Sequence, residues 1–162
     1  MTFQVDGYEK PDSNIALHEG VSFVYPTKYG EITIRSKMAG RENVKFRLAM
    51  QNHQQWSQRR KNLDAKDDDE ADRRFLGMVY DNLVISWSTT VKSGGKVIEP
   101  TRDNFIGLLS SDACGKVLSV YLQDAGDETL FKPLSDEELG NGLPNTSAGS
   151  SETAAGKNGS SK

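Results

Sequence analysis

The chain of 162 residues contains a single cysteine, Cys114, and only two histidines, His18 and His53. One cysteine cannot form an intramolecular disulfide and has no cysteine partner for a zinc site, which fits a reducing compartment. No stretch approaches the roughly 18 consecutive apolar residues that predict a transmembrane helix. The first residues also lack an apolar run of signal-peptide length. The composition therefore argues against a membrane-spanning or secreted protein.

Charge is also nearly balanced, with a formal net charge of -3 and an isoelectric point near 5.4. Such a chain has no global attraction to nucleic acid or to an anionic membrane, so either contact would need a local basic patch. Hydrophobic residues make up only 35% of the chain, which suggests that part of it stays outside the core. The segment 134–162 is rich in Gly, Ser, Asn and Thr, and we expect it to be a flexible tail.

The first third of the chain predicts an arm followed by a β-hairpin. Residues 1–20 mix turn-forming and apolar residues, so we expect a loosely ordered arm. From Val21 to Tyr25 the residues are mostly β-branched or aromatic, Pro26 to Gly30 offers a turn, and Glu31 to Arg35 alternates polar with apolar side chains. This pattern predicts a hairpin over residues 21–36.

Helical patterns dominate the remainder of the predicted domain. Asn43 is a candidate N-cap for a helix at about 44–63, and Thr101 for a helix at 102–110. The strongest apolar periodicity predicts a central helix at 68–88, and a weaker one predicts a helix at 112–125. We therefore predict an α+β, mainly helical fold with one globular domain over residues 21–133.

A search for chemistry finds no recognisable site. Neither histidine belongs to a metal-binding or nucleophile motif. The acidic run at 67–72 lacks the spacing that places alternate oxygens around calcium. Gly94-Gly95 is followed by Lys96, but the full G-x-x-x-x-G-K pattern is absent and an extended piece follows instead of the helix of a phosphate-binding loop. We predict no catalytic residue, no metal and no cofactor.

One patch of charge remains as a candidate binding surface. Residues 44–61 contain five basic side chains and no acidic one, and Trp56, Arg59 and Arg60 lie together near the end of this stretch. Such a helix could contact phosphates while the indole stacks on a base. The adjacent segment 64–72 carries six acidic residues against one lysine, so pairing within the chain or with a partner protein is the favoured interpretation.

Residues 75–131 follow an ordered pattern of motifs: a helix ending in tryptophan, a glycine turn, an extended piece leading to proline, a polar helix start with asparagine, a Leu-rich helix, and a closing helix with an acidic and an aromatic residue. The corresponding positions are Leu83, Trp87, Gly94, Gly95, Pro100, Asn104, Leu108, Leu109, Asp127 and Phe131. In this order of motifs the segment resembles a family of tail assembly chaperones of long-tailed bacteriophages. The helix start Thr101-Arg102-Asp103-Asn104 lacks the glutamate expected beside the asparagine, and Glu128, Thr129 and Leu130 intervene before Phe131.

The resemblance implies a non-enzymatic protein that binds the tape measure protein, tail tube subunits, or both, in the host cytoplasm. Trp56, Tyr80 and Trp87 are candidate contact residues for a partner helix, although a tryptophan at helical spacing is more often part of a core. Arg59, Arg60, Asn104 and Phe131 complete the candidate protein-binding set. Two alternatives stay open: a structural component of the virion, and a nucleic-acid-binding protein that uses the helix at 44–61. A homo-oligomer also stays open.

Overall fold

The computed structural model describes residues 3–60 and 65–133, so the predicted tail at 134–162 lies outside the described residues. The strands are β1 (Val21–Thr27), β2 (Gly30–Ser36), β3 (Val84–Thr89), β4 (Lys92–Ser93) and β5 (Lys96–Val97). The α-helices are α1 (Val44–Arg59), α2 (Ala65–Leu83), α3 (Arg102–Leu109) and α4 (Gly115–Gly126). Two short helical turns, η1 (Ile15–Glu19) and η2 (Glu128–Leu130), flank them. The α+β, mainly helical class predicted from the sequence is confirmed.

Three antiparallel strands form the sheet, in the order β1-β2-β3. The predicted hairpin is confirmed: β1 and β2 pair from Val21↔Ser36 to Thr27↔Gly30. Between β2 and β3, Arg35 pairs with Ser86 whereas Ser36 pairs with Val84. Ile85 of β3 is therefore the extra residue of a β-bulge. β4 and β5 form a separate short hairpin beyond β3.

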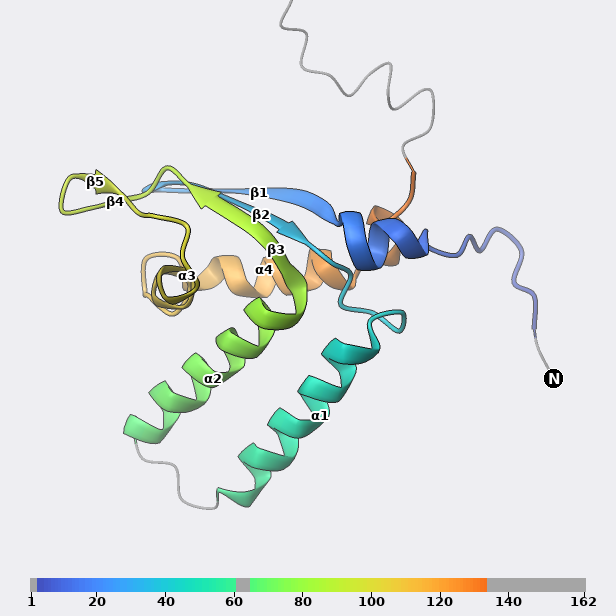
Figure 1. The fold of residues 1–162 in the computed structure, drawn as a ribbon, viewed down its shortest axis with the longest axis horizontal. Coiled ribbons are helices and arrows are strands. Elements are labelled where there is room, and N and C mark those ends of the chain that lie inside the picture. Colours follow the sequence, from blue (N-terminus) through green and yellow to red (C-terminus); the bar gives the residue numbers. More distant parts are fainter. Residues whose placement is uncertain (1–2, 61–64, 134–162) are drawn as a thin grey trace, which may run out of the picture.

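The core lies between one face of this sheet and the helices. Tyr25, Ile32, Ile34 and Trp87 project from the strands into it, each at most 7% exposed. In Figure 1, α4 runs beneath the sheet and α3 lies below the β3 end. The T-shaped contact between Trp87 and Phe105 joins the sheet to α3, with ring centroids 5.5 Å apart. No helix of the described residues covers the opposite face of the sheet (Figure 1).

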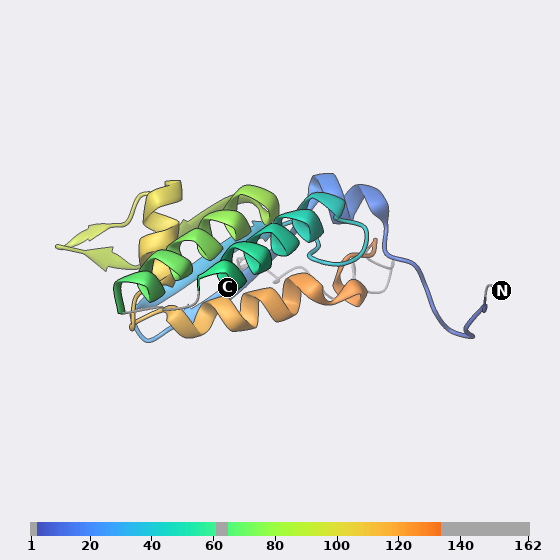
Figure 2. The ribbon, with the colours of Figure 1, turned by 90° about the horizontal axis from the view of Figure 1, so that it is seen from below.

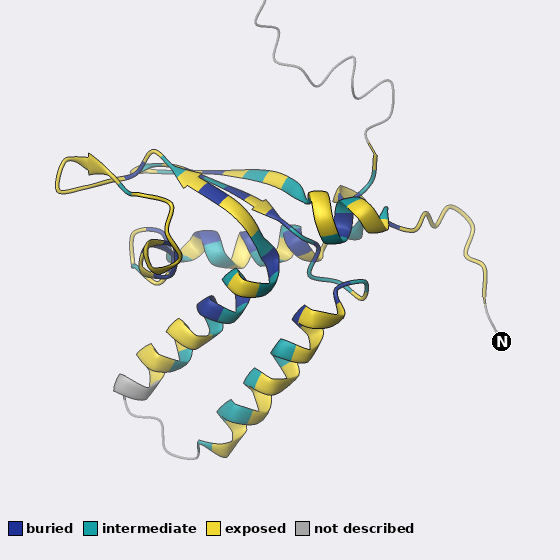
Figure 3. Cartoon of the chain, in the orientation of Figure 1, coloured by how far each residue is buried: buried dark blue, intermediate teal, exposed yellow. Residues whose placement is uncertain are grey.

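Helices α1 and α2 form an antiparallel hairpin that extends away from the sheet (Figure 1) and lies beside α4 when seen from below (Figure 2). α2 runs directly into β3, whereas α1 packs mainly against α2. Phe46, 7% exposed, is the one buried residue of α1. α1 is therefore the least enclosed α-helix of the fold, as its exposed positions in Figure 3 show.

The predicted helix at 68–88 is wrong in its last turn, because the helix ends at Leu83 and residues 84–89 form β3. Apolar spacing in the sequence continues through Val84 to Trp87, so periodicity alone extends the helix. The β-branched and Ser-rich sequence of this stretch favours a strand, and pairing with β2 satisfies its backbone. The other predicted helices start or end within a few residues of α1, α3 and α4, and the end predicted at 63 lies outside the described residues.

The predicted loose arm at 1–20 is wrong for its last part. Residues 15–19 form η1, and Ala16 is completely buried with Met38 and Phe131 in a second small core. The backbone of Met38 donates to Ala16 O at 2.8 Å. Residues from Pro11 onward therefore belong to the folded body, because burial of Ala16 fixes η1 against the end of the sheet.

Candidate protein-binding site

The start of α1 is held by a buried asparagine. Asn43 is 5% exposed, and its Oδ1 accepts a hydrogen bond from the Phe46 amide at 3.0 Å. Its Nδ2 donates to Met38 O at 3.1 Å and to Asn82 O at 3.3 Å. One side chain thus caps α1 and ties it to the end of α2, which sets the geometry of the helical hairpin.

Aromatic rings join the two helices along the hairpin. His53 on α1 lies between Trp56 and Phe75, with ring centroids 5.7 Å and 5.4 Å away. Its Nδ1 is buried without a hydrogen-bond partner in the described part of the chain. Burial, followed by the nearby Arg74 guanidinium, lowers the pKa of His53, so the ring is neutral near neutral pH.

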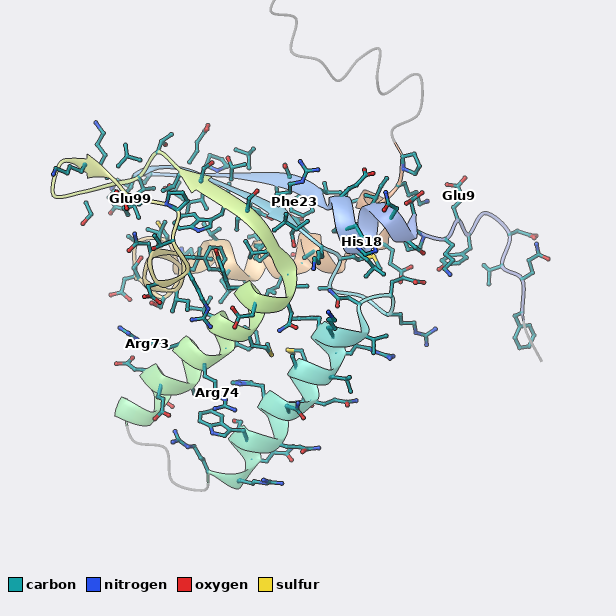
Figure 4. The ribbon with its side chains drawn as sticks, in the orientation of Figure 1. Glu9, His18, Phe23, Arg73, Arg74 and Glu99 are labelled. Atoms are coloured by element: carbon teal, nitrogen blue, oxygen red, sulfur yellow. The ribbon has the colours of Figure 1, made fainter. Side chains whose placement is uncertain are left out.

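Two guanidinium groups lie over the Trp56 ring near the C-terminal end of α1, where the chain passes on to α2. The Cζ atoms of Arg60 and Arg74 lie 4.4 Å and 4.5 Å from its centroid. Figure 4 shows Arg74 pointing into the space between α1 and α2, whereas Arg73 lies on the other side of α2. Arg60 also pairs with Glu70 at 3.3 Å. The indole is thus occupied by intramolecular cation–π contacts.

A polar cleft of about 990 Å³ opens between α1, α2 and α3. Across it, Arg102 makes a bidentate pair with Asp81, with N–O distances of 2.8 Å and 2.9 Å. The hydrogen bond from Arg102 lowers the pKa of the Asp81 carboxyl. Gly77 makes room for this pair, because a Cβ at that position would come within 2.7 Å of Arg102 Nη2. The principal charged pair in the cleft therefore joins α2 to α3.

The outward face of α1 differs from the cleft because it carries aliphatic and basic groups together. Val44 and Leu48 are 51% and 54% exposed, and Lys45 and Arg47 lie beside them. Neither of these two cations, nor Arg59, forms an ion pair with any residue that the structure describes. We call the surface formed by Val44, Lys45, Arg47 and Leu48 the α1 patch.

The candidate residues from the sequence are not brought together. Trp56, Arg59 and Arg60 lie on or at the end of α1, as predicted for a basic helix. Among the described side chains, Arg60 pairs with Glu70 in the acidic start of α2 at 3.3 Å. Lys45 and Arg47 lie at the opposite end of the hairpin from that acidic start.

Three other candidates have structural roles. Trp87 is 6% exposed on β3, and its indole N–H donates to Thr101 O at 3.2 Å. Tyr80 is half-buried against Phe105, at 5.1 Å between centroids. Phe131 is completely buried in the small second core. These side chains hold the fold and present little surface to a partner.

Asn104 is exposed, but its Nδ2 donates to Glu99 O at 3.0 Å and so fixes the turn before α3. The sequence does not predict the α1 patch as one surface, because aliphatic residues such as Val44 and Leu48 are expected in a core. Gly77, in the middle of a strongly periodic helix, was the signal that could have pointed to the Arg102–Asp81 contact.

Over residues 3–60 and 65–133, no three or more His, Cys, Asp or Glu side chains are grouped as a metal site would need. In the same residues, no helix combines the length and apolar character that crossing a membrane requires. Comparisons of the chain with protein-family models, with curated proteins and with solved structures found no match.

Proposed function

We propose that this is a non-enzymatic binding protein of the tail assembly chaperone type, which holds a partner protein through the α1 patch. The supporting observation is the exposure of Val44 and Leu48 next to two cations that form no ion pair with the described part of the chain, on a helix that is packed mainly on one side. An amphipathic partner helix with acidic residues beside its apolar stripe would match both properties. The resemblance makes the tape measure protein the first partner to test, and tail tube subunits the second.

The polar groups of the hairpin support binding over catalysis in this proposal. The cleft pairs Arg102 with Asp81, and Arg60 and Arg74 stack on Trp56. These contacts engage the charged groups with one another, outside the α1 patch. A general acid or base would instead need a group poised toward a substrate position.

Co-expression with the large helical tail protein encoded nearby tests the proposal. We expect a complex that co-purifies, and we expect Leu48→Glu to reduce its affinity at least about 10-fold, because a charge replaces buried aliphatic area. Val24→Glu is the matched control, since Val24 is 55% exposed on the open face of the sheet, close to the 54% of Leu48. Absence of a complex with either tail protein would contradict the proposed function.

The two alternatives have different expected outcomes. A chaperone acts in the host cytoplasm and is absent from finished particles, so mass spectrometry of purified virions would reveal a structural component instead. A nucleic-acid-binding protein would be retained on DNA at low salt, with loss of retention when Arg59 and Arg60 are neutralised. The stacking of Arg60 and Arg74 over Trp56 disfavours base stacking on that ring.

A further inference from the structure

The two outer strands of the sheet differ in how their free edges are protected. β1 carries Pro26, which has no N–H to offer to an added strand. β3 reads Val-Ile-Ser-Trp-Ser-Thr and contains neither proline nor a charged residue. Natural edge strands usually carry such residues, which hinder hydrogen bonding to a strand of another chain. The edge of β3 therefore lacks the protection that Pro26 gives to β1.

The free stretch of this edge is short and well defined. Thr90 N donates to Glu31 O at 3.0 Å, and antiparallel ladders alternate, so Ser86 and Ser88 direct their backbone groups to β2. Trp87 and Thr89 then direct theirs outward. The bulge at Ile85 limits the edge on one side, and Ile98, whose amide donates to Val91 O at 3.0 Å, limits it on the other. The edge can accept about three residues of an extended chain.

The described N-terminal end of the same chain carries exposed apolar side chains. Phe3 and Val5 are 81% and 66% exposed and, at alternate positions, would share one side of a strand. Among residues 3–60 and 65–133, the polar contacts that fix the arm to the body begin at Tyr8: they are Tyr8–Glu128, Glu9–Lys132 and Lys10–Glu42, of 3.3, 3.1 and 3.3 Å. Residues 3–7 project away from the body (Figures 1 and 2).

We propose that residues 3–6 of one copy add as a strand to the free edge of β3 in a second copy. The outward N–H and C=O groups of Trp87 and Thr89 would pair with the arm, which gives up a local bond from Tyr8 N to Val5 O, 3.2 Å long. Phe3 and Val5 would then lie on the core side, beside the half-buried Tyr80 and Ile98. Gln4 and Asp6 would lie on the open face beside Ser86 and Ser88, where water still reaches them.

Reciprocal exchange of two arms closes a symmetric dimer. Two strands of three or four residues bury little surface by the standard of stable interfaces, so the dimer forms at roughly micromolar concentrations or above. We expect sedimentation equilibrium to show a concentration-dependent shift from monomer to dimer for the full chain. A full chain that stays monomeric up to several hundred micromolar would overturn the inference.

Two pairs of variants separate the arm from the edge. F3S/V5S removes the apolar side of the arm, and Q4S/D6S changes the same number of residues on its other side. T89P removes the outward N–H of β3, and T89V keeps it; both lose the Thr89 hydroxyl that donates to Glu31 O at 2.7 Å. We expect F3S/V5S and T89P to be monomeric and both controls to dimerise. Dimerisation of T89P equal to that of T89V would overturn the inference.

Mixing the two monomeric variants gives the sharpest test. F3S/V5S retains an intact edge and T89P retains an intact arm, so one arm–edge contact can form between them although neither variant pairs with itself. We expect native mass spectrometry of the mixture to show a heterodimer that is weaker than the reciprocal dimer. No heterodimer, or an edge that binds a different protein while the full chain stays monomeric, would contradict arm exchange.

Discussion

His53 shows how a single side chain can couple the helical hairpin to pH. The ring is stacked between Trp56 and Phe75, and Arg74 lies nearby, so protonation would place a cation in a partly dry site beside a guanidinium. Both effects lower the pKa of His53 in the folded protein. The unfolded chain then binds the proton more readily than the folded one, near the ordinary histidine pKa of about 6.5.

This difference predicts lower stability on acidification. With its pKa lowered on folding, His53 contributes full stability above about pH 6.5, and that contribution falls as the pH drops toward the folded pKa. We expect the urea midpoint to decrease between about pH 7.5 and pH 5.5, and to decrease less in His53→Gln, which cannot be protonated. An identical decrease in both proteins would assign the pH effect to other groups.

At the scale of elements, α1 is held in place mainly by the contacts of Asn43, the residue that precedes the helix. The helix has one buried residue, Phe46, and exposed polar side chains along most of its surface. Its intrinsic stability in isolation is low for a helix of 16 residues. Asn43 compensates by capping the helix and by joining it to the carbonyls of Met38 and Asn82.

Two substitutions of Asn43 therefore separate the contribution of the cap to stability from that of the two donated hydrogen bonds. Asn43→Ala loses the cap and both donated hydrogen bonds, and we expect a loss of about 1–3 kcal/mol in the free energy of unfolding. Asn43→Ser keeps a capping oxygen but not the amide donors, so its loss should be smaller. Urea denaturation followed by circular dichroism measures both, and equal losses would show that the cap contributes nothing.

For the whole molecule, the second small core connects the beginning and the end of the described chain. Ala16, Met38 and Phe131 are completely buried together, and Phe23 contacts Phe131 at 6.1 Å between centroids. The backbone of Asp12 donates to Phe131 O at 3.0 Å. This cluster anchors η1 and the base of the N-terminal arm to the sheet.

Removal of the Phe131 ring should loosen that whole end of the molecule. We expect Phe131→Ala to lower the free energy of unfolding by about 3–5 kcal/mol, because it leaves a cavity in a closed cluster. The neighbouring Leu130 is 40% exposed, and Leu130→Ala should cost much less. Limited proteolysis should also cleave near residues 11–20 faster in Phe131→Ala than in Leu130→Ala. Equal cleavage would mean that the ring does not anchor the segment.

The sequence alone determined the features that depend on neighbouring residues. Alternation and the turn signal at Pro26 to Gly30 specify the β1–β2 hairpin, and Asn43 and Thr101 mark the starts of α1 and α3, because caps and turns act over a few neighbouring residues. Tertiary structure decided the rest. Val84 to Trp87 continue the helical spacing of α2, yet pairing with β2 makes them a strand, and Phe131 closes a core with Ala16, far away in sequence. The α1 patch and the free β3 edge also exist only once the chain is folded, since exposure depends on which distant segments fail to cover a residue.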